Sequence, residues 1–264
     1  MKIKQIRNAT LRIEYGGKNF LIDPWLIGTE ARFRFIDIPG MPFHTPDPMK
    51  EHIPMPLYEL PEPVEKVLEN VSYYLVTHIH PDHIDIGANG TLGELLDKNV
   101  PLLAQNEQEA AAFRHSGFCQ VTPLDDKPFA TSNVTLTKVC ARHGTVNPCG
   151  DACGIVFQSP GEKTLYLAGD TIWYDGVQDN LQKYRPDVVI LNACAAETVE
   201  NGRLIMNDED VSCVAKALPT AKLVISHMDN VAHATITRHS MRGLLAQRGV
   251  TNYIMPEDGE TITF

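Results

Sequence analysis

Three histidines and one aspartate fall within six residues of this chain, in the run HIHPDH at residues 78–83. Imidazole and carboxylate groups bind divalent cations, and a solvated loop seldom carries so many of them together. Residues two apart in an extended backbone face the same side, so His78 and His80 can share one ion. Pro81 bends the chain, which turns Asp82 and His83 toward a second point. The spacing predicts two adjacent metals, and a chance cluster of surface histidines is the alternative.

Three more metal-capable side chains each stand at the end of an apolar, strand-like run. His143 follows the run at 134–139, while Asp170 and His227 end the runs at 164–170 and 223–227. Any one of them alone is more often a satisfied histidine or a turn-capping aspartate. The run at 71–77 likewise leads into the histidine cluster, and α/β proteins place their chemistry where strands end. All of these positions together indicate ligands of one site.

On these residues the chain resembles the metallo-β-lactamase superfamily. The order His78-x-His80-x-Asp82-His83, then His143, Asp170 and His227, follows the superfamily pattern along nearly the whole chain. The opening stretches at 6–10, 16–17 and 21–25 are similar to the branch of ascorbate-6-phosphate lactonases and N-acylphosphatidylethanolamine-type phospholipases. The di-iron flavin branch has glutamate at the position of His80, so oxidoreductase chemistry is not expected.

The resemblance implies a single α/β domain over residues 1–264, built as a four-layer αββα sandwich. Alternating strand-like and helix-like runs agree with this and exclude an all-helical fold. Strands are predicted near 2–6, 10–14, 19–22, 72–76, 133–139, 155–158, 164–168, 187–191, 222–226 and 252–255. Helices are predicted near 91–98, 106–115, 208–217 and 237–246.

The resemblance also implies how the ligands are shared between two divalent ions. His78, His80 and His143 would hold the first ion, and Asp82, His83 and His227 the second, with Asp170 bridging both. Histidines with carboxylates suit zinc, and manganese or iron is compatible. A water shared by two such ions loses a proton near neutral pH and becomes a nucleophile.

Catalytic roles are expected for Asp82, which would accept a proton or orient the nucleophile, and for Asp170 as the bridging ligand. His233 lies six residues beyond His227 and either donates to the substrate or occupies a surface helix. Asp23 ends a strand and is predicted to accept a hydrogen bond from a ligand histidine. Trp173 and Tyr174 either line the pocket or pack on the next helix. Cys194 is predicted to be a small core residue.

A proline-rich segment at about 26–62 interrupts the alternation of elements. Eight of the 18 prolines lie between Pro39 and Pro63, which excludes helix and inner strand. Both of its flanks approach the strand ends, so we expect the segment to wall the site. One hypothesis is that it contacts substrate, with Arg32 or Arg34 binding an anionic group. The alternatives are a surface loop or an arm that holds a second subunit.

Composition narrows the class of function. The formal net charge is −10 and there is no basic run, so a nucleic-acid partner is not expected. The sequence contains no stretch of about 18 apolar residues, so no membrane span is predicted. No export signal is recognised either, so a cytoplasmic location is expected. The sequence therefore predicts a metal-dependent hydrolase of a small molecule, by resemblance a lactone, with a phosphorylated sugar lactone as one candidate. A phosphodiesterase and a non-catalytic metal-binding module are the alternatives, and a homo-oligomer is expected by resemblance only.

Overall fold

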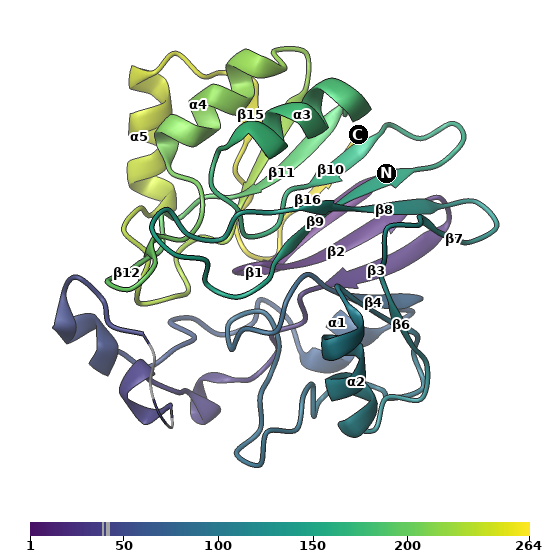
Figure 1. Cartoon of the computed structure of the whole chain (residues 1–264), viewed down its shortest axis with the longest axis vertical. Helices are drawn as coiled ribbons and strands as arrows, with labels where there is room; N and C mark the ends of the chain where they lie inside the picture. Colours follow the sequence, from purple (N-terminus) through teal and green to yellow (C-terminus); the bar gives the residue numbers. More distant parts are fainter. Residues whose placement is uncertain (39, 41–42) are drawn as a thin grey trace.

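Two seven-stranded β-sheets pack face to face in the computed structural model, which describes residues 1–38, 40 and 43–264 (Figure 1). The first sheet has the order β16-β1-β2-β3-β4-β5-β6. Its strands are β1 (Lys2–Arg7), β2 (Thr10–Tyr15), β3 (Lys18–Ile22), β4 (Tyr73–Val76), β5 (Leu102–Ala104), β6 (Val121–Pro123) and β16 (Thr261–Thr263).

The second sheet has the order β15-β14-β11-β10-β9-β8-β7. Its strands are β7 (Phe129–Ala130), β8 (Thr135–Cys140), β9 (Cys153–Gln158), β10 (Leu165–Leu167), β11 (Val188–Asn192), β14 (Lys222–Ser226) and β15 (Tyr253–Ile254). A separate two-stranded ribbon consists of β12 (Glu197–Thr198) and β13 (Gly202–Arg203).

Helices cover the outer face of each sheet, which completes the predicted αββα sandwich (Figure 1). Helices α1 (Val64–Leu68) and α2 (Glu107–His115) lie on the first sheet, and α3 (Asp175–Tyr184), α4 (Asp208–Ala217) and α5 (Arg238–Gln247) lie on the second. No helix in the described ranges has both the length and the apolar character needed to cross a bilayer.

The core between the sheets is built from the inward-facing residues of both. Phe20 of β3 meets Phe157 of β9 edge to face, with ring centroids 5.4 Å apart, and Tyr15 of β2 packs on the same ring at 5.7 Å. Such contacts add to the burial of apolar area, which is the main driving force for folding. The two sheets are therefore held in a fixed relation on which the site depends.

Parallel pairing brings the ends of distant strands to one edge of the sandwich. Strands β10, β11 and β14 run parallel, so their C-terminal ends lie side by side. Strands β3 and β4 are also parallel, and β4 ends two residues before His78. Residues that immediately follow these strands therefore collect at one place.

The helix predicted near 91–98 is wrong, because this segment forms turns. Gly93 has φ +58°, outside the helical region, and its N–H donates to the carbonyl of Asp85. Leu92 and Leu96 are nevertheless buried beneath α2, so their apolar spacing reflects packing and not a helical period. The sequence did not predict α1, the ten-residue helix α3, or the short strands β5, β6, β7, β12, β13 and β16.

The proline-rich segment forms an excursion beside the sandwich, as expected (Figure 1). It contains three short 3-10 helices: η1 (Thr29–Ala31), η2 (Phe35–Asp37) and η3 (Pro48–His52). A single bridge between Phe33 and Met55 pairs its two arms. Pro39 and Pro42 lie outside the described residues.

Candidate metal centre

All seven predicted ligands meet at the edge of the sandwich. Their donor atoms form three overlapping groups, within each of which the atoms lie inside 4.8 Å of one another. The groups are His78–His80–His143, His78–His83–Asp170 and Asp82–His83–His227. The second group shares members with the other two, so the seven residues form one continuous centre.

The first group is held by the loops after β4 and β8. The Nε2 atom of His78 lies 2.9 Å from Nδ1 of His80. His143 is buried, and its Nε2 atom has no hydrogen-bond partner. Its Nδ1 atom lies 3.0 Å from the carbonyl of Leu204, which fixes the ring.

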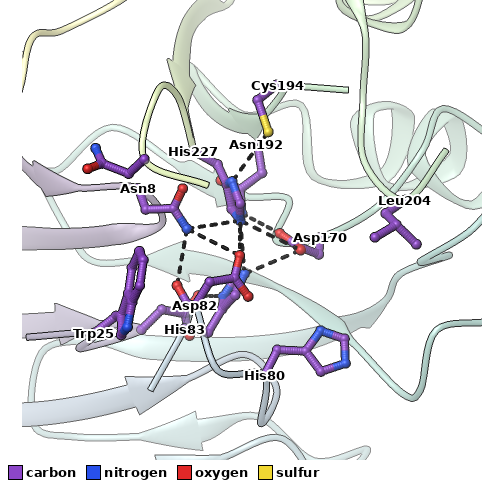
Figure 2. A network of polar contacts seen from close by, with 12 residues as sticks. Asn8, Trp25, His80, Asp82, His83, Asp170, Asn192, Cys194, Leu204 and His227 are labelled. Carbon is purple, nitrogen blue, oxygen red and sulfur yellow. Dashed lines mark hydrogen bonds and ion pairs between the residues drawn. The ribbon is translucent and has the colours of Figure 1, made fainter. Parts of the chain in front are cut away.

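The third group, Asp82–His83–His227, combines residues from both sheets. The Nε2 atoms of His83 and His227 lie 3.1 Å apart, and Nε2 of His227 lies 3.2 Å from Oδ2 of Asp82. Figure 2 shows Asp82, His83 and His227 converging with Asp170 at the same point.

Asp170 occupies a central position between the first and third groups. Its Oδ2 atom lies 3.3 Å from His83 and 3.8–3.9 Å from His78, His143 and His227. The residue before it, Gly169, has φ +67°, and a Cβ there would overlap the carbonyl of Cys153. Glycine at this turn thus allows Asp170 to enter the centre.

The donor set fits divalent cations. Imidazole nitrogens face one another across two short gaps, between His78 and His80 and between His83 and His227, and among the described residues the buried Nε2 of His143 has no hydrogen-bond partner. A cation shared between such nitrogens satisfies them, whereas a buried acceptor left unpaired is destabilising. Five histidines and two aspartates are also the ligand types of a hydrolytic metal site.

Asp23 supports two of the ligands, as predicted. Its Oδ2 atom lies 2.9 Å from Nδ1 of His83 and accepts a hydrogen bond of 2.8 Å from the hydroxyl of Thr77. That hydroxyl is 3.1 Å from Nδ1 of His78. Asp23 is buried and holds the left-handed conformation at φ +43°.

Three further residues make polar contacts with the centre that were not predicted from the sequence. Asn192 donates to Oδ1 of Asp170 at 2.7 Å, and Sγ of Cys194 lies 3.6 Å from Nδ1 of His227. Asn8 contacts both the carboxylate of Asp82, at 3.4 Å, and His227, at 3.3 Å. Asn192 ends a strand that neighbours Asp170, which was the one available signal for it. Cys194 is buried, as predicted, but also contacts a ligand.

Burial and neighbouring charges shift the pKa values of the site histidines in opposite directions. Burial and the neighbouring imidazole of His143 lower the pKa of His80 to about 3, so its ring is neutral and free to bind a metal. Burial also opposes the charged form of His83, but the carboxylates of Asp170, Asp23 and Asp82 outweigh it and raise its pKa to about 10. Negative charge is therefore concentrated around His83, where a cation can replace the proton.

A small cavity of about 30 Å³ adjoins the centre, with His80 and Asp82 in its wall. Its other lining residues are Phe35, Phe43, Pro81, Cys149, Thr198, Leu204 and His233. His233 is buried, not on a helix surface, and its ring lies 4.9 Å from that of Phe35. Its Nδ1 atom has no partner, and burial lowers its pKa to about 4.

The excursion therefore walls the site, as predicted, but through its aromatic residues and not its arginines. Arg32 donates to the carbonyl of Leu57, and Arg34 pairs with Asp37 at 2.7 Å. Neither arginine lines the cavity, so the hypothesis that they bind an anionic group there is wrong.

Of the two expectations for Trp173 and Tyr174, packing on the next helix is the correct one. Both pack against the core on the outer face of the second sheet. Tyr174 is the N-cap residue of α3, and its hydroxyl donates to the carbonyl of Cys140.

Comparison with known proteins agrees with this centre. Residues 18–228 match the family described as "Beta-lactamase superfamily domain". The chain is 38% identical over 272 aligned positions to the UPF0173 protein YddR of Bacillus subtilis (strain 168), with 100% of both chains covered. A UPF0173 metal-dependent hydrolase of Koribacter versatilis is 26% identical over 200 positions, covering 72% of this chain and 71% of that protein.

Two solved structures are similar over the whole chain. An isothiocyanate hydrolase from Delia radicum gut bacteria is 36% identical with a TM-score of 0.88, covering 100% of this chain and 99% of that one. A possible metal-dependent hydrolase from Veillonella parvula is 31% identical with a TM-score of 0.87 and the same coverage. The chain therefore belongs to the metallo-β-lactamase superfamily and, within it, to the UPF0173 family of metal-dependent hydrolases.

Proposed function

We propose that the protein hydrolyses small, uncharged isothiocyanates, with its seven ligands holding two divalent ions. Zinc is the leading candidate for these ions, and manganese and iron are the alternatives. The observation that supports this is the narrow, mostly apolar cavity beside the centre. Among the described residues that line it, none is lysine or arginine. Its volume of about 30 Å³ suits the reacting group of a substrate and little else, since each water alone needs about 10–15 Å³.

An isothiocyanate has a linear N=C=S head with an electrophilic central carbon. This head is narrower than a lactone ring, and it carries no charge that would require a cationic partner. The similarity to an isothiocyanate hydrolase over the full chain supports the same class. In the overall reaction, water oxygen bonds to the carbon, nitrogen takes up protons, and the C–N bond breaks to leave an amine and carbonyl sulfide.

Divalent ions, when bound, would lower the pKa of a coordinated water and polarise the substrate. The protein's own residues then have distinct tasks. Asp82, contacted by Asn8 and His227, is placed to orient the attacking water and accept its proton. His233, whose ring faces the cavity beside Phe35, is placed to donate a hydrogen bond to the substrate nitrogen.

The test is a substrate panel with the purified protein loaded separately with zinc, manganese and iron. We expect loss of the isothiocyanate absorbance of 2-phenylethyl isothiocyanate, with release of the amine. Asp170→Asn is the matched control, because it removes a ligand charge at nearly constant volume. An active Asp170→Asn enzyme, or no loss of isothiocyanate with any metal, would contradict the proposal.

Lactone opening is the second candidate, because the same centre can attack an ester carbonyl and the opening stretches resemble the lactonase branch. A γ-lactone belongs in the panel, and its hydrolysis without that of isothiocyanates would favour this candidate. A phosphorylated lactone or a phosphodiester finds no cationic side chain among the described residues of the cavity. A non-catalytic metal-binding module would be supported if metal were bound and the whole panel were left intact.

A further inference from the structure

A second and much larger cavity, of about 830 Å³, lies next to the one at the metal centre. Phe43 and Pro81 line both cavities, so the two adjoin at these side chains. The large cavity is formed between the proline-rich excursion and the loop that follows the histidine cluster. Its apolar wall includes Ile27, Phe33, Ile38, Phe43, Ile86 and Leu95.

The polar part of this wall is acidic. Glu30, Asp37, Asp85 and Glu94 line it, and no lysine, arginine or histidine is among its described lining residues. Asp37 is already paired with Arg34. Within the described part of the chain, the carboxylates of Glu30, Asp85 and Glu94 make no ion pair.

Two of these carboxylates lie directly against glycines of the wall. A Cβ atom at Gly28 would overlap the carboxylate of Glu30, and one at Gly87 would overlap that of Glu94. Both glycines also line the cavity. A side chain at either position would displace the flexible end of the neighbouring glutamate.

Asp85 supplies a third carboxylate, and this one is buried, with only 3% of the residue exposed. Its Oδ1 atom accepts the N–H groups of Leu26 and Ile27 at 2.9 and 3.0 Å. Among the described residues, its Oδ2 atom has no hydrogen-bond partner. Arg7, the buried cation nearby, donates instead to the carbonyls of Trp25 and Ile27. A buried carboxylate oxygen without a donor is unfavourable unless a ligand supplies one.

We propose that this cavity binds an organic ammonium ion with an apolar body, such as an arylalkylammonium. The volume lies in the range of small-molecule sites. The carboxylates complement the ammonium group, and the rings of Phe33 and Phe43 can stabilise the cation through their faces. An anionic ligand of the same shape would be repelled.

This proposal does not rest on isothiocyanate hydrolysis. If the protein does catalyse that reaction, however, the large cavity has a role in it. The amine left by that reaction is protonated near neutral pH. It would leave a centre that holds metal cations and enter an acidic cavity just beyond Phe43 and Pro81. The large cavity would then receive the product.

Calorimetric titration of the metal-loaded protein with 2-phenylethylammonium chloride tests the proposal without any turnover. Two probes of matched shape, 2-phenylethanol and 3-phenylpropionate, serve as the neutral and anionic comparisons. We expect the ammonium ion to bind at least about tenfold more tightly than either, with an affinity that falls as salt is raised.

The double variant Glu30→Gln, Glu94→Gln should weaken ammonium binding by about tenfold or more. Both side chains are exposed, so folding should be unaffected. The variant Glu65→Gln, Asp126→Asn removes the same charge from two exposed positions outside the cavity and should leave binding unchanged. Leu95→Trp, which narrows the cavity at its apolar wall, should weaken binding while circular dichroism confirms the fold.

Equal binding of the alcohol and the ammonium ion, or an unchanged affinity in the Glu30→Gln, Glu94→Gln variant, would overturn the proposal. So would a dimer in solution whose interface covers the cavity and prevents binding. Isothiocyanate hydrolysis without ammonium binding would leave the proposed function intact, and ammonium binding without hydrolysis would leave this proposal intact.

Discussion

At the scale of single residues, Asp23 shows how one buried carboxylate orients two ligands. It contacts His83 directly and reaches His78 through the hydroxyl of Thr77. Ligand histidines commonly depend on such partners for their tautomer and orientation. The left-handed backbone of Asp23 is one that aspartate and asparagine tolerate better than most residues.

Asp23→Asn should lower metal affinity by about 10- to 100-fold, because it removes the charge behind His83 while keeping size and backbone preference. Competition with a chromogenic chelator measures this affinity. Glu65→Gln, an exposed carboxylate distant from the centre in sequence, is the control. Wild-type affinity in the Asp23→Asn protein would show that the contact has no role in metal binding.

His233→Ala should reduce kcat on the proposed isothiocyanate substrate by about 10²- to 10⁴-fold, the usual contribution of a positioned proton donor. Metal content, measured by elemental analysis, should stay at the wild-type level because His233 is not among the grouped ligands. A variant that loses metal and activity together would instead make His233 a ligand.

At the scale of elements, the proline-rich excursion is fixed to the β12–β13 ribbon. The imidazole of His44 pairs with the carboxylate of Glu200 at 2.5 Å, and the backbone carbonyl of His44 accepts the N–H of Val199 at 2.7 Å. This contact holds the neighbouring Phe43 over both cavities. The position of Phe43 in the wall of both cavities thus depends on contacts with another part of the chain, one of them an exposed ion pair.

The carboxylate of Glu200 raises the pKa of His44 above its ordinary value of 6.5. A raised folded pKa means that the pair stabilises the fold fully below pH 6.5 and that this contribution is lost as pH rises through the folded pKa. Glu200→Gln should return the pKa of His44 toward 6.5, as followed by NMR of the imidazole protons. An unchanged titration would show that the pair is not formed in solution.

At the scale of the whole molecule, the metal centre joins the two sheets. His78, His80, Asp82 and His83 follow β4 of the first sheet, whereas His143, Asp170 and His227 follow β8, β10 and β14 of the second. A cation held by both sets therefore resists separation of the layers. Without one, buried histidines and carboxylates from the two layers face each other directly.

Metal removal should lower the melting temperature. A ligand that binds only the folded state at about 1,000 times its Kd adds about 4 kcal/mol to the free energy of unfolding. For a chain of this size that corresponds to a shift of about 10 °C. Calorimetry with stepwise addition of zinc after chelation measures it, and a melting temperature independent of zinc would contradict the role of the centre in joining the sheets.

The ligand set was predictable from the sequence because each ligand follows an apolar run. Strand runs such as 222–226 are read from β-branched and aliphatic residues, and helices such as 208–217 from their apolar spacing. The helix prediction at 91–98 was wrong because turns, and not a helix, place Leu92 and Leu96 in the core under α2. Two- and three-residue strands such as β7 carry too few residues to show a period.

The sequence by itself determined which side chains are candidate metal ligands, that strands and helices alternate, and that a proline-rich excursion interrupts them, since these are local properties of residue type and order. Only the tertiary structure decided that Phe35, Phe43 and His233 share one cavity with the ligands, that Arg32 and Arg34 are turned to other partners, and that Asn8, Asn192 and Cys194 contact the centre. These contacts join residues up to 219 positions apart, and their distances depend on how two sheets pack and not on any local spacing.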